Sequence, residues 1–413
     1  MKKIIFAITA LLVLGLILEN MVYTKRANNY VREGAGPYYN LVTILPEGVK
    51  LNILDDGEKW KLIETDGAVR GWIAANSLSD KKANTNLTSK LADLWSSSKV
   101  SKVSLAGAVK GLTGKLGSVG EGDVNQFFRL IRNEVTESEA QGFVNLIDLY
   151  SSENRDEVDF DDIGVEIKEY DPVLEEQQIG LGIASRLAAK GVHPNTNVKK
   201  YIDLVSRALL IKSNFYDFEF HTLLLNQEQA DGFACPGGYI FITKGAYLVC
   251  EDESELAAII AHELSHVLLK HGMKEMKERA VHIKSDDMFA ELDEETDDEF
   301  GNETADELDG MMANMYEKVV GYRTLEYETE ADKAASILLA NAGYDPWGIV
   351  RITNKLALLH KQEKDIFHDN YLSPNEVQKR FELIKSFVND NYEKENPGGT
   401  FKSRFNKYYD QLK

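Results

Sequence analysis

The chain has few cysteines and no excess of basic residues, and each shortage excludes a class of protein. Two cysteines among 413 residues cannot build a disulfide-rich secreted domain, which needs several bridges. Lysine and arginine number 47 against 67 acidic residues, for a formal net charge of −20. Because a phosphate-binding surface must be basic, this balance argues against nucleic acid as a partner and disfavours an anionic lipid surface.

The two cysteines, Cys235 and Cys250, leave two interpretations open. In an exported protein they could form one disulfide, although spacing alone does not show that they meet. We favour two small buried side chains. Neither cysteine has another cysteine at the spacing of a zinc site.

Apolar runs are also scarce, and the clearest one stands at the start of the chain. Met1, Lys2 and Lys3 precede an uncharged, mostly apolar stretch at residues 4–18, which is typical of a secretory signal. The run is short for a spanning helix, which needs roughly 17–25 residues. No small-residue cleavage site follows, so an uncleaved anchor is the alternative, and a buried helix is a third. We expect residues 1–22 to direct export to the periplasm or the outer face of the cytoplasmic membrane, with membrane contact only through this segment.

Residues 23–80 are predicted to form a small all-β module. Short alternating segments are separated by turn residues, and five or six strands at that spacing favour a small barrel. The string at 29–34, together with Trp60 and the segment 71–73, resembles the bacterial SH3-like domain. The resemblance implies a binding module for peptidoglycan or a protein ligand. Alternatively, Trp60 and Trp72 fill the barrel core.

Residues 81–165 are predicted to be a linker and helical region. Ser, Asn, Lys and Gly are frequent in its first half, where the clearest short helix is at 87–95. Apolar periodicity indicates helix over 123–152. We assign no function to this part.

The remaining part, 166–413, mixes long helices with a few apolar strands. Helical segments show apolar residues at spacings of three and four, and the strands are short and rich in β-branched or aromatic residues. The helix that ends at 271 has acidic residues in its first turn and basic residues at its end. The predicted helices are at 181–190, 198–211 and 253–271, and the predicted strands are at 218–225 and 238–243.

The helix predicted at 253–271 carries an HExxH motif. His262 and His266 are four residues apart on one helical face, so both imidazoles can reach one metal ion. Glu263 can then act as general base on a zinc-bound water. The residues before the motif are apolar or alanine, so the helix is buried and its histidines need a partner such as a metal.

A catalytic zinc needs a third protein ligand and an open position. A second helix begins near Glu328 and ends before Gly343, which suits a C-terminal cap. Glu328 and Asp332 share a face at a spacing of four, so one can bind zinc while the other orients a ligand histidine. On composition alone Glu326 and Glu330 compete, and periodicity does not choose among them.

Several segments together resemble metallopeptidase family 48. They are the stretch 231–245, the approach to the HExxH motif at 255–257, the ExxxD sequence at 328–332 and the segment 342–346. The similarity runs from about 175 to 380. It implies a zincin-type α+β fold, mainly helical with a small sheet, and one Zn²⁺ per chain. It also implies that Glu328 is the third zinc ligand and that Asp332 is the aspartate of the motif.

One position departs from the family pattern. Soluble members usually carry a His-Pro pair followed by an arginine, and the corresponding residues here are Ser373-Pro374, followed by Arg380. The family histidine is thought to assist at the active site. Its replacement puts oxyanion stabilisation in question, unless His360 or His368 takes its place.

Two further segments are predicted to influence substrate access. Gly237 and Gly238 would let a peptide approach closely, and the strand from Tyr239 would pair with it at an exposed sheet edge. A core strand with a glycine turn is the alternative. The segment 285–310 carries 13 acidic residues and is either a solvated insertion or a lid over the site.

These patterns predict a zinc endopeptidase that acts on protein or peptide substrates of the cell envelope. The alternative is a zinc-stabilised binding or assembly factor with little proteolytic activity, which Ser373 favours. Glu263 favours the enzyme, because a scaffold needs no general base. Peptidoglycan hydrolysis, suggested by the SH3-like resemblance, is a third interpretation.

Overall fold

The computed structural model describes residues 21–26, 28–37, 39–67, 69–81, 127, 130–131, 135–148, 174–211, 213, 215–218, 220–274, 324–362, 372–392 and 398–413. The chain divides into two compact units, Met1–Ser101 with Asp171–Val173, and Lys102–Tyr170 with Leu174–Lys413. The predicted apolar run at 4–18, the short helix at 87–95 and the acidic segment at 285–310 lie outside the described residues. The predicted domain limits at 80 and 165 stay predictions.

Every helix within the described ranges is too short or too polar to cross a membrane.

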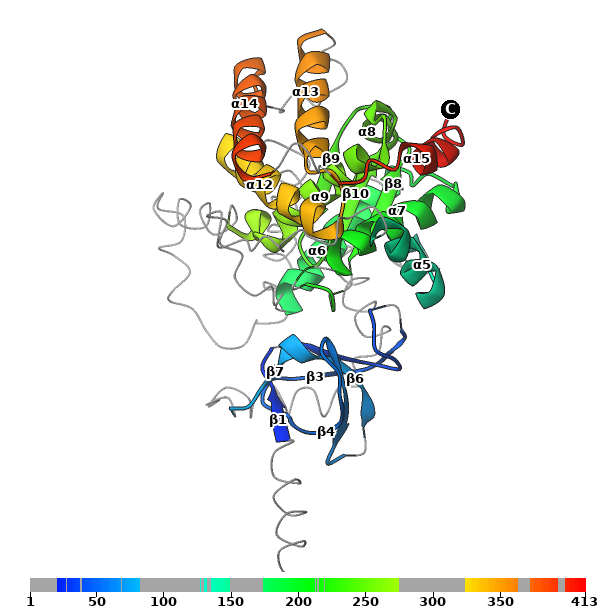
Figure 1. Ribbon diagram of the computed structural model, residues 1–413, viewed down its shortest axis with the longest axis vertical. Helices are drawn as coiled ribbons and strands as arrows, with labels where there is room; N and C mark the ends of the chain where they lie inside the picture. Colours follow the sequence, from blue (N-terminus) through cyan, green and yellow to red (C-terminus); the bar gives the residue numbers. More distant parts are fainter. Residues whose placement is uncertain are drawn as a thin grey trace, which may run out of the picture. The chain divides into compact units, whose positions relative to one another are not determined.

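The first unit, drawn in blue in Figure 1, is an antiparallel sheet of seven strands, ordered β3-β2-β6-β5-β4-β1-β7. Hairpins connect β4 to β5 and β5 to β6, as the glycine-containing turns predict. The alternation of the sequence puts one set of side chains on each face. The strands are β1 (Met21–Thr24), β2 (Asn29–Arg32), β3 (Leu41–Leu45), β4 (Lys50–Asp56), β5 (Trp60–Thr65), β6 (Arg70–Ala74) and β7 (Leu78–Ser79).

The core of this sheet is aliphatic. Val31, Leu51 and Ile63 are fully buried within it, as expected for residues on the same face of neighbouring strands. Trp60 and Trp72 are only partly buried, so the interpretation that they fill the core is wrong. The SH3-like resemblance and the ligand that it implies stay predictions.

The second unit contains a three-stranded sheet with the order β8-β10-β9. Strand β10 (Tyr239–Thr243) is the middle strand, parallel to β8 (His221–Leu225) and antiparallel to β9 (Gly232–Cys235). The sequence predicted β8 and β10 but not β9, which is short and begins with glycine. Cys235 and Cys250 are buried and are not joined in a disulfide, in agreement with the favoured interpretation.

Helices make up most of the second unit, which confirms the α+β class. Figure 1 shows α12 and α14 side by side, and these two helices are in contact. The helices are α5 (Glu137–Asp148), α6 (Leu174–Ala189), α7 (Thr196–Ile211), α8 (Lys244–Val249), α9 (Glu253–Leu268), α12 (Leu325–Ala342), α13 (Trp347–Gln362), α14 (Pro374–Asn391) and α15 (Lys402–Tyr409).

Helix α9 is buried along its whole length, and α12, α13 and α7 pack against it. Its N-terminus is capped by Asp252, whose side chain accepts a hydrogen bond from the backbone N–H of Glu255 at 3.0 Å. The helix ends three residues before the predicted end, at Leu268. Lys270 has a φ of 56°, and a residue in this left-handed conformation cannot continue a right-handed helix.

A buried carboxylate fixes the N-terminal end of α9. Glu253 is fully buried, and it accepts hydrogen bonds from the hydroxyls of Tyr201 and Tyr344, each at 2.8 Å. Arg404 of α15 forms an ion pair with the same carboxylate. Burial raises the pKa of Glu253, although Arg404 and both tyrosines oppose this effect. Because these partners come from three distant segments, they fix the position of the helix that carries the HExxH motif.

Candidate metal centre

Helix α9 brings the two motif histidines together. His262 and His266 are 6% and 3% exposed, and their Nε2 atoms lie 3.0 Å apart. Residues four apart on a helix lie one turn above each other on one face. Since the whole helix is buried, both rings point into the protein rather than into solvent.

Helix α12 supplies the carboxylate that completes the cluster. Glu328 is buried, and its two carboxylate oxygens lie 3.3 Å from His262 Nε2 and 3.3 Å from His266 Nε2. These three residues form a group whose ligand atoms all lie within 4.8 Å of one another. Of the competing glutamates, Glu326 is exposed and Glu330 contacts His271 instead. Of the three candidate glutamates, Glu328 is therefore the one that lies beside both histidines, and its role as a zinc ligand stays a prediction.

The geometry of this cluster fits a zinc ion. In a tetrahedral site with bonds of about 2.0–2.1 Å to nitrogen and oxygen, neighbouring ligand atoms lie about 3.3 Å apart. Here the two imidazole Nε2 atoms lie 3.0 Å apart, and each lies 3.3 Å from a different oxygen of the Glu328 carboxylate, close to that spacing. Two imidazoles and one carboxylate also form a donor set that zinc uses in catalytic sites.

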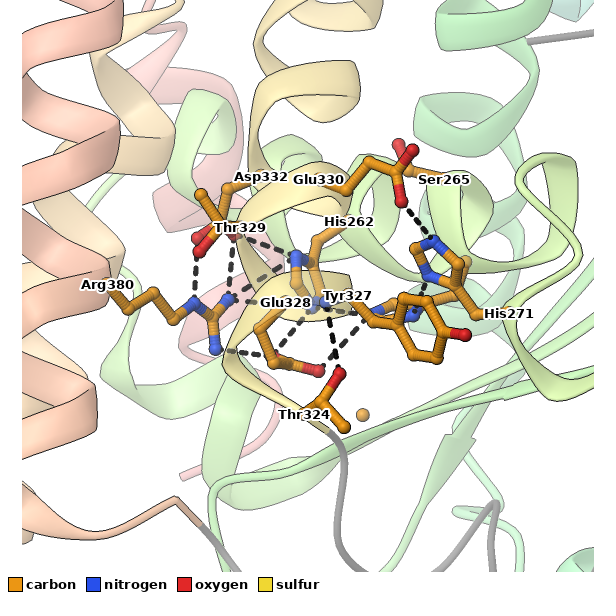
Figure 2. Close-up of polar contacts among 12 residues, drawn as sticks. His262, Ser265, His271, Thr324, Tyr327, Glu328, Thr329, Glu330, Asp332 and Arg380 are labelled. Atoms are coloured by element: carbon orange, nitrogen blue, oxygen red, sulfur yellow. Dashed lines mark hydrogen bonds and ion pairs between the residues drawn. The ribbon is translucent and has the colours of Figure 1, made fainter. Parts of the chain in front are cut away.

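Asp332 lies one turn beyond Glu328 and contacts the first histidine from the other side. Its Oδ1 accepts a hydrogen bond from His262 Nδ1 at 2.8 Å, which leaves Nε2 with a lone pair for a metal. Arg380 of α14 donates to both oxygens of Asp332 at 2.7 Å and to Glu328 at 2.6 Å. Figure 2 shows this arginine reaching both carboxylates beside His262.

The electrostatics of the site keep both carboxylates charged. Burial alone would raise the pKa of Glu328, but Arg380 and His262 hold it well below its usual range. The same two neighbours lower the pKa of Asp332. Burial and Arg380 lower the pKa of His262, but the two carboxylates more than offset them and raise it to about 9. The two carboxylates thus favour a proton on His262 at neutral pH, which a bound metal ion would have to displace.

Glu263, the predicted general base, lies against strand β9. It is 4% exposed, and a Cβ atom added at Gly232 would lie 2.9 Å from its Cδ and closer still to Oε1. Glycine at this position thus leaves the space that the carboxylate occupies. Sequence reasoning missed this contact, because β9 was not predicted.

The predicted substrate strand is not at a sheet edge. Strand β10 pairs with β8 on one side and with β9 on the other, so the prediction of an exposed edge from Tyr239 onward is wrong. Gly237 and Gly238 form the turn between β9 and β10, with φ values of 76° and 94° that favour glycine. Contact of these three residues with a substrate stays a prediction.

Ser373 takes a structural position at the start of α14. Its hydroxyl donates to the Glu376 carboxylate at 2.7 Å and accepts from the Glu376 backbone N–H at 3.4 Å. The Glu376 carboxylate also accepts from the Ser373 backbone N–H at 2.9 Å. The two residues form a capping box, so the Ser373 hydroxyl caps the start of the helix rather than contacting the metal centre.

Sequence reasoning assigned no role to two buried residues of the site. Arg380 was noted only as the arginine that follows Ser373, and His271 only as a residue at the end of its helix. A buried arginine is costly unless it is paired. That rule would have required carboxylate partners for Arg380, but the sequence did not show that it is buried.

Comparisons with known proteins agree with this geometry. Residues 194–386 match the model described as Peptidase family M48. The beta-barrel assembly-enhancing protease of Yersinia pestis is 28% identical over 165 residues, which cover 38% of this chain and 32% of that protein. The protein of the same name from Escherichia coli K12 is 26% identical over 160 residues, covering 38% and 32%.

A eukaryotic protein is similar to this chain at a comparable level of identity. The mitochondrial metalloendopeptidase OMA1 of Schizosaccharomyces pombe is 26% identical over 155 residues, which cover 37% of this chain and 42% of that protein. The chain thus spans about a third of the length of its bacterial relatives. The matched segment contains the HExxH motif, Glu328, Asp332 and Arg380. Residues 194–386 of this chain belong to peptidase family M48.

Proposed function

We propose that the protein is a zinc metallopeptidase that hydrolyses peptide bonds in protein substrates. The observation that carries the proposal is the convergence of His262, His266 and Glu328 on one point, with the two histidines on a helix that also carries the buried Glu263. A purely structural zinc site is closed by four protein ligands. Within the described residues this cluster offers three, which suits a site with one position open to water.

Each residue then has a distinct task. A zinc ion bound here would supply a Lewis acid and a water of lowered pKa. Glu263 accepts the proton of the attacking water on a carboxylate oxygen and later delivers it to the leaving amine. Asp332 holds His262 in the tautomer with a proton on Nδ1, and Arg380 fixes Asp332 and Glu328 relative to each other.

We place the extended substrate along β9. This strand is at the edge of its sheet, and Gly232 brings its backbone against Glu263. A peptide that pairs with the free edge of a strand is held by main-chain hydrogen bonds. Its scissile bond would then pass the carboxylate of the base.

The test compares the full-length protein with Glu263→Gln in zinc content and in casein cleavage. We expect about one zinc per chain in both proteins, and cleavage reduced by at least about 100-fold in the variant, because general base catalysis contributes that much. Glu326→Gln is the matched control, since Glu326 is an exposed residue of α12, and it should cleave like the parent. Equal cleavage by parent and Glu263→Gln would contradict the proposal.

One observation favours the alternative, a zinc-stabilised binding or assembly factor. The family histidine is replaced by Ser373, and the Ser373 hydroxyl is engaged in the cap of α14. If the parent binds zinc but does not cleave casein or an unfolded envelope protein, this alternative replaces the peptidase.

We further infer that the substrates are proteins of the cell envelope. Support comes from the signal-like pattern at residues 1–22 and from relatives named as beta-barrel assembly-enhancing proteases. Fusion of alkaline phosphatase to the C-terminus should give an active, exported reporter. An inactive reporter with a normally produced fusion would contradict export.

The first unit is proposed to bind peptidoglycan or a protein ligand. The support is limited to the SH3-like resemblance of the string at 29–34 and its neighbours. Co-sedimentation of the full-length protein with purified peptidoglycan tests the first of these ligands. Absence of the protein from the pellet would leave the protein ligand.

A further inference from the structure

His271 occupies an unusual position just after the end of α9. The helix ends at Leu268, and the backbone turns at Lys270 with a φ of 56°. This left-handed conformation is unfavourable for a non-glycine residue. The turn places the ring of His271 back against the helix, where it is 2% exposed.

The ring joins a metal ligand to a carboxylate. His271 Nδ1 lies 2.8 Å from His266 Nδ1, and His271 Nε2 lies 3.1 Å from Glu330 Oε2. The ring also stacks on Tyr327, with centroids 4.4 Å apart and an angle of 18° between the planes. Figure 2 shows His271 between Tyr327 and Glu330.

The protons in this chain can be assigned from chemistry. A histidine that binds a metal through Nε2 must carry its proton on Nδ1. His266 therefore donates from Nδ1 to His271 Nδ1, and neutral His271 must carry its own proton on Nε2. That proton is donated to Glu330, whose pKa is lowered chiefly by this hydrogen bond.

The hydrogen bonds that reach His266 resemble the one that orients the other histidine of the motif, His262. His262 donates from Nδ1 directly to Asp332, whereas His266 reaches its carboxylate through one additional ring. Both carboxylates belong to α12, the helix that also carries Glu328. Each histidine ligand thus has a separate partner that fixes its tautomer and orientation.

We propose that His271, held by Glu330 and Tyr327, is a positioning residue that keeps the Nε2 lone pair of His266 directed at the metal. The inference deepens the proposed zinc peptidase function and rests on it for any effect on turnover. Its effect on metal affinity is independent of turnover, because the tautomer of a ligand affects binding before any substrate is present.

The experiment measures zinc affinity by chelator competition and the visible spectrum of the Co²⁺-substituted full-length protein. His271→Phe keeps a ring that can stack on Tyr327 but removes both hydrogen bonds, and we expect zinc affinity to fall about 10- to 100-fold. The Co²⁺ bands should shift, which a merely structural role would not produce. His271→Gln retains an acceptor and a donor and should recover most of the affinity.

Two further variants keep the test decisive. Glu330→Ala changes a partly exposed residue of α12 and should weaken zinc binding several-fold, even if His271→Phe does not fold. His221→Phe is the matched control, because this histidine also stacks on a tyrosine, Tyr239, but lies on β8. It should bind zinc like the parent.

The outcomes separate this inference from the proposed function. Parent affinity and an unshifted Co²⁺ spectrum in both His271→Phe and Glu330→Ala would overturn the role of His271, whatever the cleavage results. A parent that binds zinc but cleaves nothing would overturn the peptidase and leave the affinity comparison valid. A parent that binds no zinc would overturn both.

Discussion

Gly232 determines how closely the sheet approaches the proposed base. A methyl group there would overlap the carboxylate of Glu263, which is the flexible end of a side chain and can move away. We therefore expect a methyl group at this position to affect catalysis more than folding. A catalytic group displaced by about 1 Å can lose about 100-fold in rate.

We therefore expect Gly232→Ala to reduce kcat/KM for casein by about 10- to 100-fold while zinc content stays near one per chain. Gly142→Ala is the control, because a Cβ atom there meets nothing within 4 Å. The check is a steady-state assay with metal analysis of the same samples. An unchanged kcat/KM would show that the position of Glu263 is not critical.

At the residue scale, the position of each acidic residue along α12 also determines which histidine it contacts. Positions 328 and 332 face the same side of a helix, whereas 330 is rotated by about 200° from 328. Composition could not separate these carboxylates, because they are chemically alike. The orientation of α12 against α9 separates them: Glu328 and Asp332 reach His262, and Glu330 reaches His271.

Among the elements, α12 and α14 carry residues of the site, and capping interactions define where these helices begin or end. Helix α12 begins at a Thr324 cap and ends at Gly343, whose φ is 88°. Helix α14 begins at the capping box of Ser373 and Glu376, two turns before Arg380. Such signals are local, and Gly343 predicted the C-terminal end of α12 correctly, whereas the helix begins at Leu325, three residues before the predicted start.

We expect Ser373→Ala to lower the free energy of unfolding by about 1 kcal/mol, the usual cost of losing an N-cap side chain. Zinc affinity and kcat/KM should stay at the parent values, because the hydroxyl is engaged with Glu376. Urea denaturation and the casein assay check the two halves of this prediction. A large loss of activity with normal stability would instead give Ser373 a role in catalysis.

At the scale of the whole molecule, residues far apart in sequence meet at the N-terminal end of α9. Arg404 and Glu253 are separated by 151 positions and share two hydrogen bonds. The guanidinium also lies over the ring of Phe143, 3.9 Å from its centroid. These contacts join α5, α9 and α15 around one buried charge.

Arg404→Met should cost about 3 kcal/mol in the free energy of unfolding, because it leaves the Glu253 carboxylate buried without its cation. The raised pKa of Glu253 should rise further in the variant. The loss should therefore be larger at pH 8 than at pH 5, where the carboxyl more readily takes up a proton. Lys402→Met, at an exposed position of α15, should cost little, and an equal cost would contradict the prediction.

The raised pKa of His262 makes zinc affinity depend on pH. The folded pKa of His262 is raised from 6.5 to about 9, so its proton stabilises the metal-free fold fully below pH 6.5, and this contribution is lost as pH rises through 9. Zinc must displace that proton. We expect apparent zinc affinity to rise by about tenfold per pH unit from pH 7 to 9 and then to level off.

Calorimetry in buffers of different ionisation enthalpy checks this at pH 7.5, where zinc binding should release about one proton. Asp332→Asn removes one of the charges that raise the pKa and should reduce the proton release. Proton release that is the same in parent and variant would assign the proton to another group.

The sequence by itself located the two HExxH histidines, the proposed base and the helix that carries them, because helical spacing and capping are local properties. Through the family resemblance it also pointed to Glu328. The tertiary structure alone decided that β10 lies inside its sheet, that Gly232 makes room for Glu263 and that Arg380 and His271 contact residues of the site. Each of these depends on how separate elements pack, and packing partners distant in sequence leave no local pattern in the chain.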